Sequence, residues 1–135
     1  MFVADKGQTL DKNHVAIGLF AAISILDKWG AIAKKACAIL RISPSTYARA
    51  KNKDDSDWTV NLDADVMQRI SLVLNIHSAL RLIFDNPENV YGFVGMKNDN
   101  EFLNGRTPMD IMAQGDFVSL YETFNRIDSL CTAGW

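Results

Sequence analysis

Apolar residues recur at helical spacing through almost the whole sequence, and this period constrains the fold more than any other feature. Between residues 63 and 84 one stripe advances by steps of four and three residues: Val66, Ile70, Val73, His77, Leu80 and Phe84. A second stripe beside it consists of Leu72, Ile76, Ala79 and Ile83. A helix with two apolar stripes is buried on two sides, as when it joins two halves of a protein or lies in a dimer seam. Since only the short run DWTVNLD (57–63) alternates like a strand, we expect an all-α protein.

Capping and stop residues divide the rest of the chain into further helices. The first is expected over residues 13–29, and it should end at Gly30. Its inward-facing residues are expected to be Ile17, Phe20, Ile23, and Ile25 or Leu26. Thr107 is placed to cap a helix that begins at Pro108 and ends at Gly115. A last helix, over residues 116–130, should bury Phe117, Leu120, Phe124 and Ile127.

The composition is that of a folded, soluble protein. Of the 135 residues 48% are apolar and 22% are charged, which allows one domain, or two small ones that share a helix. The longest apolar run, Val15 to Leu26, is too short to span a bilayer, so we interpret it as a buried helix. Cys37 and Cys131 stand far apart and without metal-binding neighbours, which is typical of free thiols in a reducing cytosol.

The residues that most enzymes need are missing from the sequence. His14 and His77 are too far apart to form a metal-binding pair, and His77, on an apolar stripe, is better explained as a hydrogen-bonded core histidine. No phosphate-binding glycine loop and no nucleophile motif occurs in the sequence. We therefore expect no catalytic residues, no metal and no cofactor, although folding could still bring two carboxylates together.

The formal net charge of -2 hides an uneven distribution. Residues 31–53 contain six basic side chains and no acidic one, whereas the remainder has 8 basic and 16 acidic residues. Within this basic block, small residues such as Ala36 and Cys37 allow close helix packing, and Ser43 with Pro44 starts another helix. This order is typical of a helix-turn-helix, although Arg41 stands where such turns often have glycine. The DNA-binding residues would be Lys34, Lys35, Ser43, Ser45, Thr46, Arg49, Lys51 and Lys53. A helical hairpin with a merely basic face is the alternative.

The second notable stretch is FLNGRTPMDIMAQGDFVSLYETFNRID, residues 102–128. It resembles the toxin-binding region of the Xre/MbcA/ParS antitoxin family, in which a glycine precedes a Thr/Ser-Pro helix start, the helix ends at glycine, and the last helix ends in an Arg-Ile-acid sequence. The matching residues are Gly105, Thr107, Pro108, Gly115, Arg126, Ile127 and Asp128. Upstream, LRLIFDNPENVYGFVGMKNDNEF also fits, with Phe93 and Val94 where a Trp-Leu pair is common. The segment from Trp29 to Lys51 is similar to the family's Xre-like helix-turn-helix.

This resemblance implies a bacterial, cytoplasmic antitoxin with two parts. Residues 1–78 would form the DNA-binding and dimerisation region, and a long helix would join it to a small helical toxin-binding domain, residues 79–135. The partner would be a RES-domain toxin that destroys NAD, and the antitoxin would cover its active site. Family members often dimerise and bind their own operator. The expected toxin-binding residues are Asn100, Phe102, Gly105, Arg106, Pro108, Asp110, Arg126 and Trp135.

Two observations bear on the partner. From Asp99 onward the sequence contains six acidic residues and only two basic ones, Arg106 and Arg126. Such an acidic segment suits a basic NAD-binding cleft. The terminal Trp135 is either a frayed end or an aromatic anchor whose carboxylate enters that cleft. A free-standing helix-turn-helix regulator is the main alternative function, and a helical adaptor that binds no DNA is another.

Overall fold

The computed structural model describes residues 12–52, 60–97 and 103–133. The helices in chain order are α1 (Lys12–Lys28), α2 (Ala33–Leu40), α3 (Pro44–Asn52), α4 (Ala64–Ile83), α5 (Pro87–Gly92), the short 3-10 helix η1 (Phe93–Gly95), α6 (Pro108–Met112) and α7 (Phe117–Ala133). Because no strand occurs in these three ranges, the expectation of an all-α protein is confirmed for them. Among the described helices, none is both long and apolar enough to cross a membrane.

Capping residues lie close to several predicted helix ends, although α6 ends at Met112, three residues before the predicted stop at Gly115. Gly30 and Gly115 have φ angles of 88° and 92°, a left-handed conformation that glycine adopts without a Cβ clash. The Oγ1 atom of Thr107 accepts from the Asp110 N–H at 3.0 Å, and the Asp110 carboxylate accepts from the Thr107 N–H at 3.4 Å. This reciprocal capping box starts α6. The positions of these helix ends are thus encoded by residues next to them in the chain.

Carboxylates at helix starts make the stability of this fold depend on pH. The Arg41 guanidinium, followed by the Val66 N–H, lowers the pKa of Asp63. Hydrogen bonds from Thr107 lower the pKa of Asp110, and hydrogen bonds from Ser119 lower that of Asp116. A carboxyl group whose pKa is lower in the folded state than in the unfolded state stabilises the fold above the unfolded pKa, and this contribution is lost as the pH falls through the folded pKa.

We therefore expect the melting temperature to fall below about pH 4, where unfolded carboxyl groups bind protons. Circular dichroism melts between pH 7 and pH 3 measure this dependence. The Asp110→Asn variant serves as a control, since it should melt at a lower temperature at neutral pH but change less on acidification. A melting temperature that stays constant between pH 5 and pH 3 would contradict the prediction.

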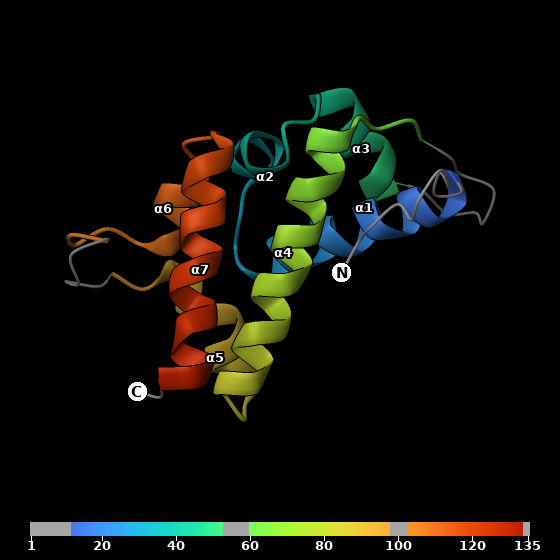
Figure 1. Cartoon of the computed structure of the whole chain (residues 1–135). Coiled ribbons are helices and arrows are strands. Elements are labelled where there is room, and N and C mark those ends of the chain that lie inside the picture. Colours follow the sequence, from blue (N-terminus) through green and yellow to red (C-terminus); the bar gives the residue numbers. More distant parts are fainter. Residues whose placement is uncertain (1–11, 53–59, 98–102, 134–135) are drawn as a thin grey trace.

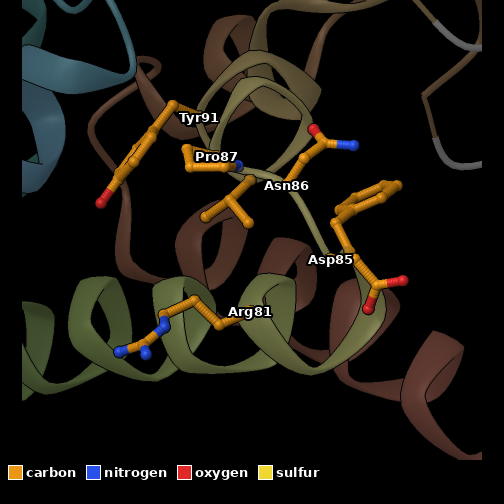
Figure 2. Close-up of a pocket in the computed structure, with 7 residues that line it drawn as sticks. Arg81, Asp85, Asn86, Pro87 and Tyr91 are labelled. Atoms are coloured by element: carbon orange, nitrogen blue, oxygen red, sulfur yellow. The ribbon is translucent and has the colours of Figure 1, made fainter.

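Helix α4 runs through the centre of the molecule, and the other helices pack around it (Figure 1). Helix α7 lies beside it along much of its length, while α1 crosses it on another side. Helices α2 and α3 lie toward the start of α4, and α5 lies toward its end. Where α4 gives way to α5, side chains of both helices line an open groove (Figure 2). The predicted burial of α4 on two sides is confirmed, since the buried residues include Val66, Ile70, Val73, Leu72, Ile76, Ala79 and Leu80.

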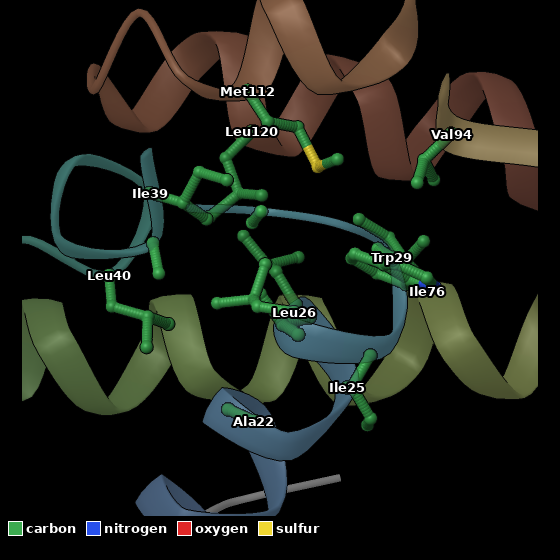
Figure 3. Packing of buried hydrophobic residues seen from close by; sticks show 14 of the residues in the cluster. Ala22, Ile25, Leu26, Trp29, Ile39, Leu40, Ile76, Val94, Met112 and Leu120 are labelled. Atoms are coloured by element: carbon green, nitrogen blue, oxygen red, sulfur yellow. The ribbon is translucent and has the colours of Figure 1, made fainter. Parts of the chain in front are cut away.

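One buried cluster holds the helices together. Figure 3 shows side chains from α1, α2, α4 and α7 converging in it, among them Leu26, Ile39, Ile76 and Leu120. The cluster includes residues on both sides of position 78, where the sequence predicts the division into two regions, and that position itself lies inside α4. Each region therefore buries apolar surface against the other.

The expected inner face of α1 was partly wrong. Ile17 and Phe20 are 59% and 42% exposed, whereas Leu19 between them is fully buried. Ile23 and Leu26 are buried as expected. The run from Val15 to Leu26 is apolar on nearly every side, so the spacing of its apolar residues does not indicate which side is buried. Packing against α3 and α4 decides which face is covered.

Candidate functional site

The turn between α2 and α3 contains three residues, Arg41 to Ser43. Arg41 occupies the left-handed conformation expected of a glycine, with φ 56° and ψ 48°. For a residue with a Cβ this conformation costs about 1–2 kcal/mol. Its guanidinium bonds the carboxylates of both Asp63 and Asp65 at the start of α4, and these bonds raise the pKa of Arg41. Arg41 thus closes the turn, and its exposed guanidinium pairs with two acids.

Helix α3 begins at a serine cap. The Thr46 N–H donates to the Ser43 Oγ at 3.0 Å, and the two hydroxyl groups are also 3.0 Å apart. Ala50 is fully buried, and Tyr47 is half-buried against the same cluster, so the predicted core positions of α3 are confirmed. Ser45 and Arg49 are exposed. The outer side of α3 therefore carries Ser45 and Arg49, and the hydroxyl groups of Ser43 and Thr46 bond each other at the start of the helix.

The predicted DNA-binding lysines differ in their surroundings. Lys34 is exposed on α2. Lys35 lies 3.8 Å from the Asp110 carboxylate on α6, and Lys51 lies 3.2 Å from Asp27 at the end of α1. Exposed ion pairs of this kind contribute little to stability, so both lysines keep the ability to exchange partners. Lys53 lies outside the described residues.

The predicted toxin-binding residues are only partly described. Gly105 has a φ of 81°, and the Arg106 side chain donates to the Leu103 carbonyl oxygen at 2.9 Å, so both shape the turn before α6. Asp110 and Arg126 are exposed on α6 and α7. Pro108 is buried at the start of α6, and its role as a toxin contact stays a prediction. Asn100, Phe102 and Trp135 lie outside the described residues.

Arg69, which the sequence did not single out, connects the predicted DNA-binding region with the predicted toxin-binding region. Its side chain is 6% exposed. The Nη1 atom donates to the carbonyl oxygens of Gly115 at 2.7 Å and Ile39 at 3.3 Å, and Nε donates to the Asp65 carboxylate at 3.0 Å. The Ile39 carbonyl group lies in the last turn of α2, where backbone acceptors lack partners within the helix, and the Gly115 carbonyl group lies in the turn between α6 and α7. One arginine thus ties the end of α2 to the turn between α6 and α7.

The signal that could have identified Arg69 is its spacing from Asp65. An acid and an arginine four residues apart lie on one helix face and can form an ion pair. Arg69 also directly precedes Ile70, a member of the apolar stripe. Its two carbonyl partners are 30 and 46 positions away in the chain, which no local pattern indicates.

The described side chains offer binding surfaces more readily than a catalytic centre. No group of three or more His, Cys, Asp or Glu residues suited to a metal ion occurs among the described residues. Burial raises the pKa of the Cys37 thiol, and burial together with Asp128 raises that of Cys131, so both cysteines favour the unreactive thiol form.

Comparison with known proteins finds a curated relative of nearly the same length. It is the "Uncharacterized protein y4oB" of Sinorhizobium fredii, 30% identical over 121 residues, which cover 88% of each chain. No family model matches the chain. No solved structure matches it either.

Proposed function

The chain belongs to the same family as the y4oB protein of Sinorhizobium fredii, and we propose that it is the antitoxin of a bacterial type II toxin–antitoxin pair. In this proposal it is a cytoplasmic protein without enzymatic activity or cofactor. Its C-terminal part binds a RES-domain toxin and covers the active site that degrades NAD. Its helices α2 and α3 form a helix-turn-helix, here called the α2–α3 hairpin, that binds the operator of its own operon. The protein acts as a homodimer within a larger toxin–antitoxin complex.

The observation that carries the DNA-binding half of the proposal is the geometry of this hairpin. Three residues separate α2 from α3, as in a helix-turn-helix, and Ala36 and Ala50 are buried where the two helices pack into the core. The first turn of α3 and its exposed side carry Ser45 and Arg49, and Lys34 is exposed on α2. Such a helix can enter a major groove with its N-terminal residues at the base edges, while lysines contact phosphates.

Support for the toxin-binding half comes from residues 102–128, which resemble the corresponding region of Xre/MbcA/ParS antitoxins. The capping box at Thr107 and the left-handed Gly115 are the structural counterparts of the Thr-Pro and glycine positions in that resemblance. The exposed acids Asp110, Asp116 and Asp128 suit a partner whose NAD-binding cleft is basic.

The test is co-expression with the adjacent toxin-sized reading frame. We expect that frame alone to stop growth and deplete cellular NAD, and we expect this chain to restore both. The Arg49→Ala variant is a matched control because it should bind the operator more weakly but still restore NAD. A neighbour that is harmless, or NAD depletion that this chain does not reverse, would contradict the antitoxin proposal.

A free-standing transcription regulator is the second candidate, because the α2–α3 hairpin would serve it equally well. The two functions differ in one measurable respect. A regulator binds its operator without a partner and protects cells from no neighbouring protein. Operator binding combined with a harmless neighbour would therefore favour the regulator.

A further inference from the structure

The groove between α4 and α5 is separate from all residues proposed above for DNA or toxin binding. It is lined by Arg81, Phe84, Asp85, Asn86, Pro87, Val90 and Tyr91, and we call it the α4–α5 groove. Its volume is about 360 Å³, within the range of pockets that bind small molecules. Phe84, Pro87 and Val90 supply an apolar wall. The groove therefore combines room for a small ligand with a mainly polar, open lining that has an apolar wall on part of its surface.

One end of the α4–α5 groove is positively charged. The Arg81 guanidinium lies there on the same side as the Tyr91 hydroxyl, whereas the Asp85 carboxylate points to the opposite side (Figure 2). Lys28, at the end of α1, places its Nζ atom 5.3 Å from the centre of the Tyr91 ring. Within the described part of the chain, neither Arg81 nor Lys28 has a carboxylate within ion-pair distance. Arg81 thus brings a positive charge to one end of the groove and Lys28 lies against the Tyr91 ring, while the one acidic side chain of the lining, Asp85, points to the opposite side (Figure 2).

His77 contacts Tyr91 at this end of the groove. Its ring stacks on Tyr91 with centroids 5.5 Å apart, and its Nε2 atom is 3.2 Å from the Tyr91 hydroxyl oxygen. Burial lowers the pKa of His77, and the charges of Arg81 and Lys28 lower it further. A neutral imidazole can accept the hydrogen bond from the tyrosine, which holds the ring of Tyr91 at the groove.

We propose that the α4–α5 groove binds a small amphipathic anion, a carboxylate or phosphate group on an apolar or aromatic body. Arg81 would bind the anion through two parallel N–H donors, which suit both carboxylate and phosphate. Lys28 adds a second positive charge near the Tyr91 ring. The apolar body would lie against Phe84, Pro87 and Val90. The site requires no DNA and no protein partner, so it is independent of the proposed antitoxin function.

The test is an NMR titration of the full chain with benzoate and with phenyl phosphate as probes. We expect saturable shifts of the Val90 and Tyr91 amide signals, with a dissociation constant on the order of 1 mM for a ligand as small as benzoate. Inorganic phosphate should bind roughly fivefold or more weakly than phenyl phosphate, because it lacks the ring. Benzyl alcohol, which has the ring without the charge, should also bind more weakly. A bound anion should raise the pKa of His77 by offsetting the charges of Arg81 and Lys28.

A pair of charge-matched variants locates the site. Arg81→Gln should weaken binding of both probes by roughly tenfold, as expected for the loss of a charged hydrogen-bond donor. Lys34→Gln removes the same charge from α2, toward the other end of α4 in Figure 1, and should leave binding unchanged. Both side chains are exposed, so neither variant should unfold.

Four results would overturn the proposal. They are the absence of saturable shifts, equal losses in the two variants, inorganic phosphate binding as tightly as phenyl phosphate, and benzyl alcohol binding as tightly as benzoate. The relative affinities of benzoate and phenyl phosphate then identify which anion the groove prefers.

Discussion

Replacing Arg69 by methionine should lower the free energy of unfolding by about 3 kcal/mol, because the change removes one partner from a buried charged network. The carbonyl oxygens of Ile39 and Gly115 would both lose their donor, the first in a buried and the second in a partly buried place. Asp65 would keep its bond to Arg41, so most of the cost should come from the two carbonyl groups. Urea unfolding followed by circular dichroism measures the difference.

Arg81→Met is the matched control for this prediction, since it makes the same replacement at an exposed position of the same helix. We expect it to change the free energy of unfolding by no more than about 0.5 kcal/mol. Arg69→Lys should fall between the two, because an ammonium group keeps the charge but cannot reach three acceptors with the same geometry. Equal losses for Arg69→Met and Arg81→Met would show that the Arg69 network contributes nothing specific.

The second large effect concerns DNA. If α3 reads base edges, Arg49→Ala should weaken operator binding by about 1–3 kcal/mol, which is about 5-fold to 150-fold, and should relax the base preference at one position. Fluorescence anisotropy with operator and scrambled duplexes at fixed salt measures both quantities. Fixed salt is needed because phosphate contacts make affinity depend steeply on ionic strength.

Arg126→Ala controls for the loss of one positive charge, since Arg126 is exposed on α7 and not on α3. We expect it to leave operator affinity nearly unchanged. If Arg49→Ala weakens binding equally on operator and scrambled DNA, then Arg49 is a phosphate contact and base reading lies elsewhere on α3. If it changes neither affinity, the assignment of α3 as the recognition helix is wrong.

The sequence predicted the helices and several of their ends because the interactions that set them are local. The hydrogen bond between Ser43 and Thr46 spans three residues, and so does the capping box between Thr107 and Asp110. Gly115 was predicted as a helix stop for the same reason, because glycine adopts the left-handed conformation by virtue of its own missing side chain. Such signals can be identified in a single sequence without knowing what lies across the fold.

Parts of the candidate site were predictable on the same grounds, and parts were not. The placement of Ser45 and Arg49 on the outer side of α3 follows from the helical period once Ala50 is assigned to the core. The burial of Pro108 could not be predicted, because its local role, starting a helix, does not reveal whether that helix start faces water or another helix.

The sequence by itself determined the all-α class, the two-sided burial of α4 and the caps of α3 and α6, because each depends on spacing or on neighbours within a few residues. Only the tertiary structure decided which face of α1 is covered, that Lys35 meets Asp110, and that Arg69 bonds carbonyl oxygens 30 and 46 positions away. Those outcomes depend on which helix faces meet. That choice is made by packing the whole apolar surface at once, and no short segment of the chain contains it.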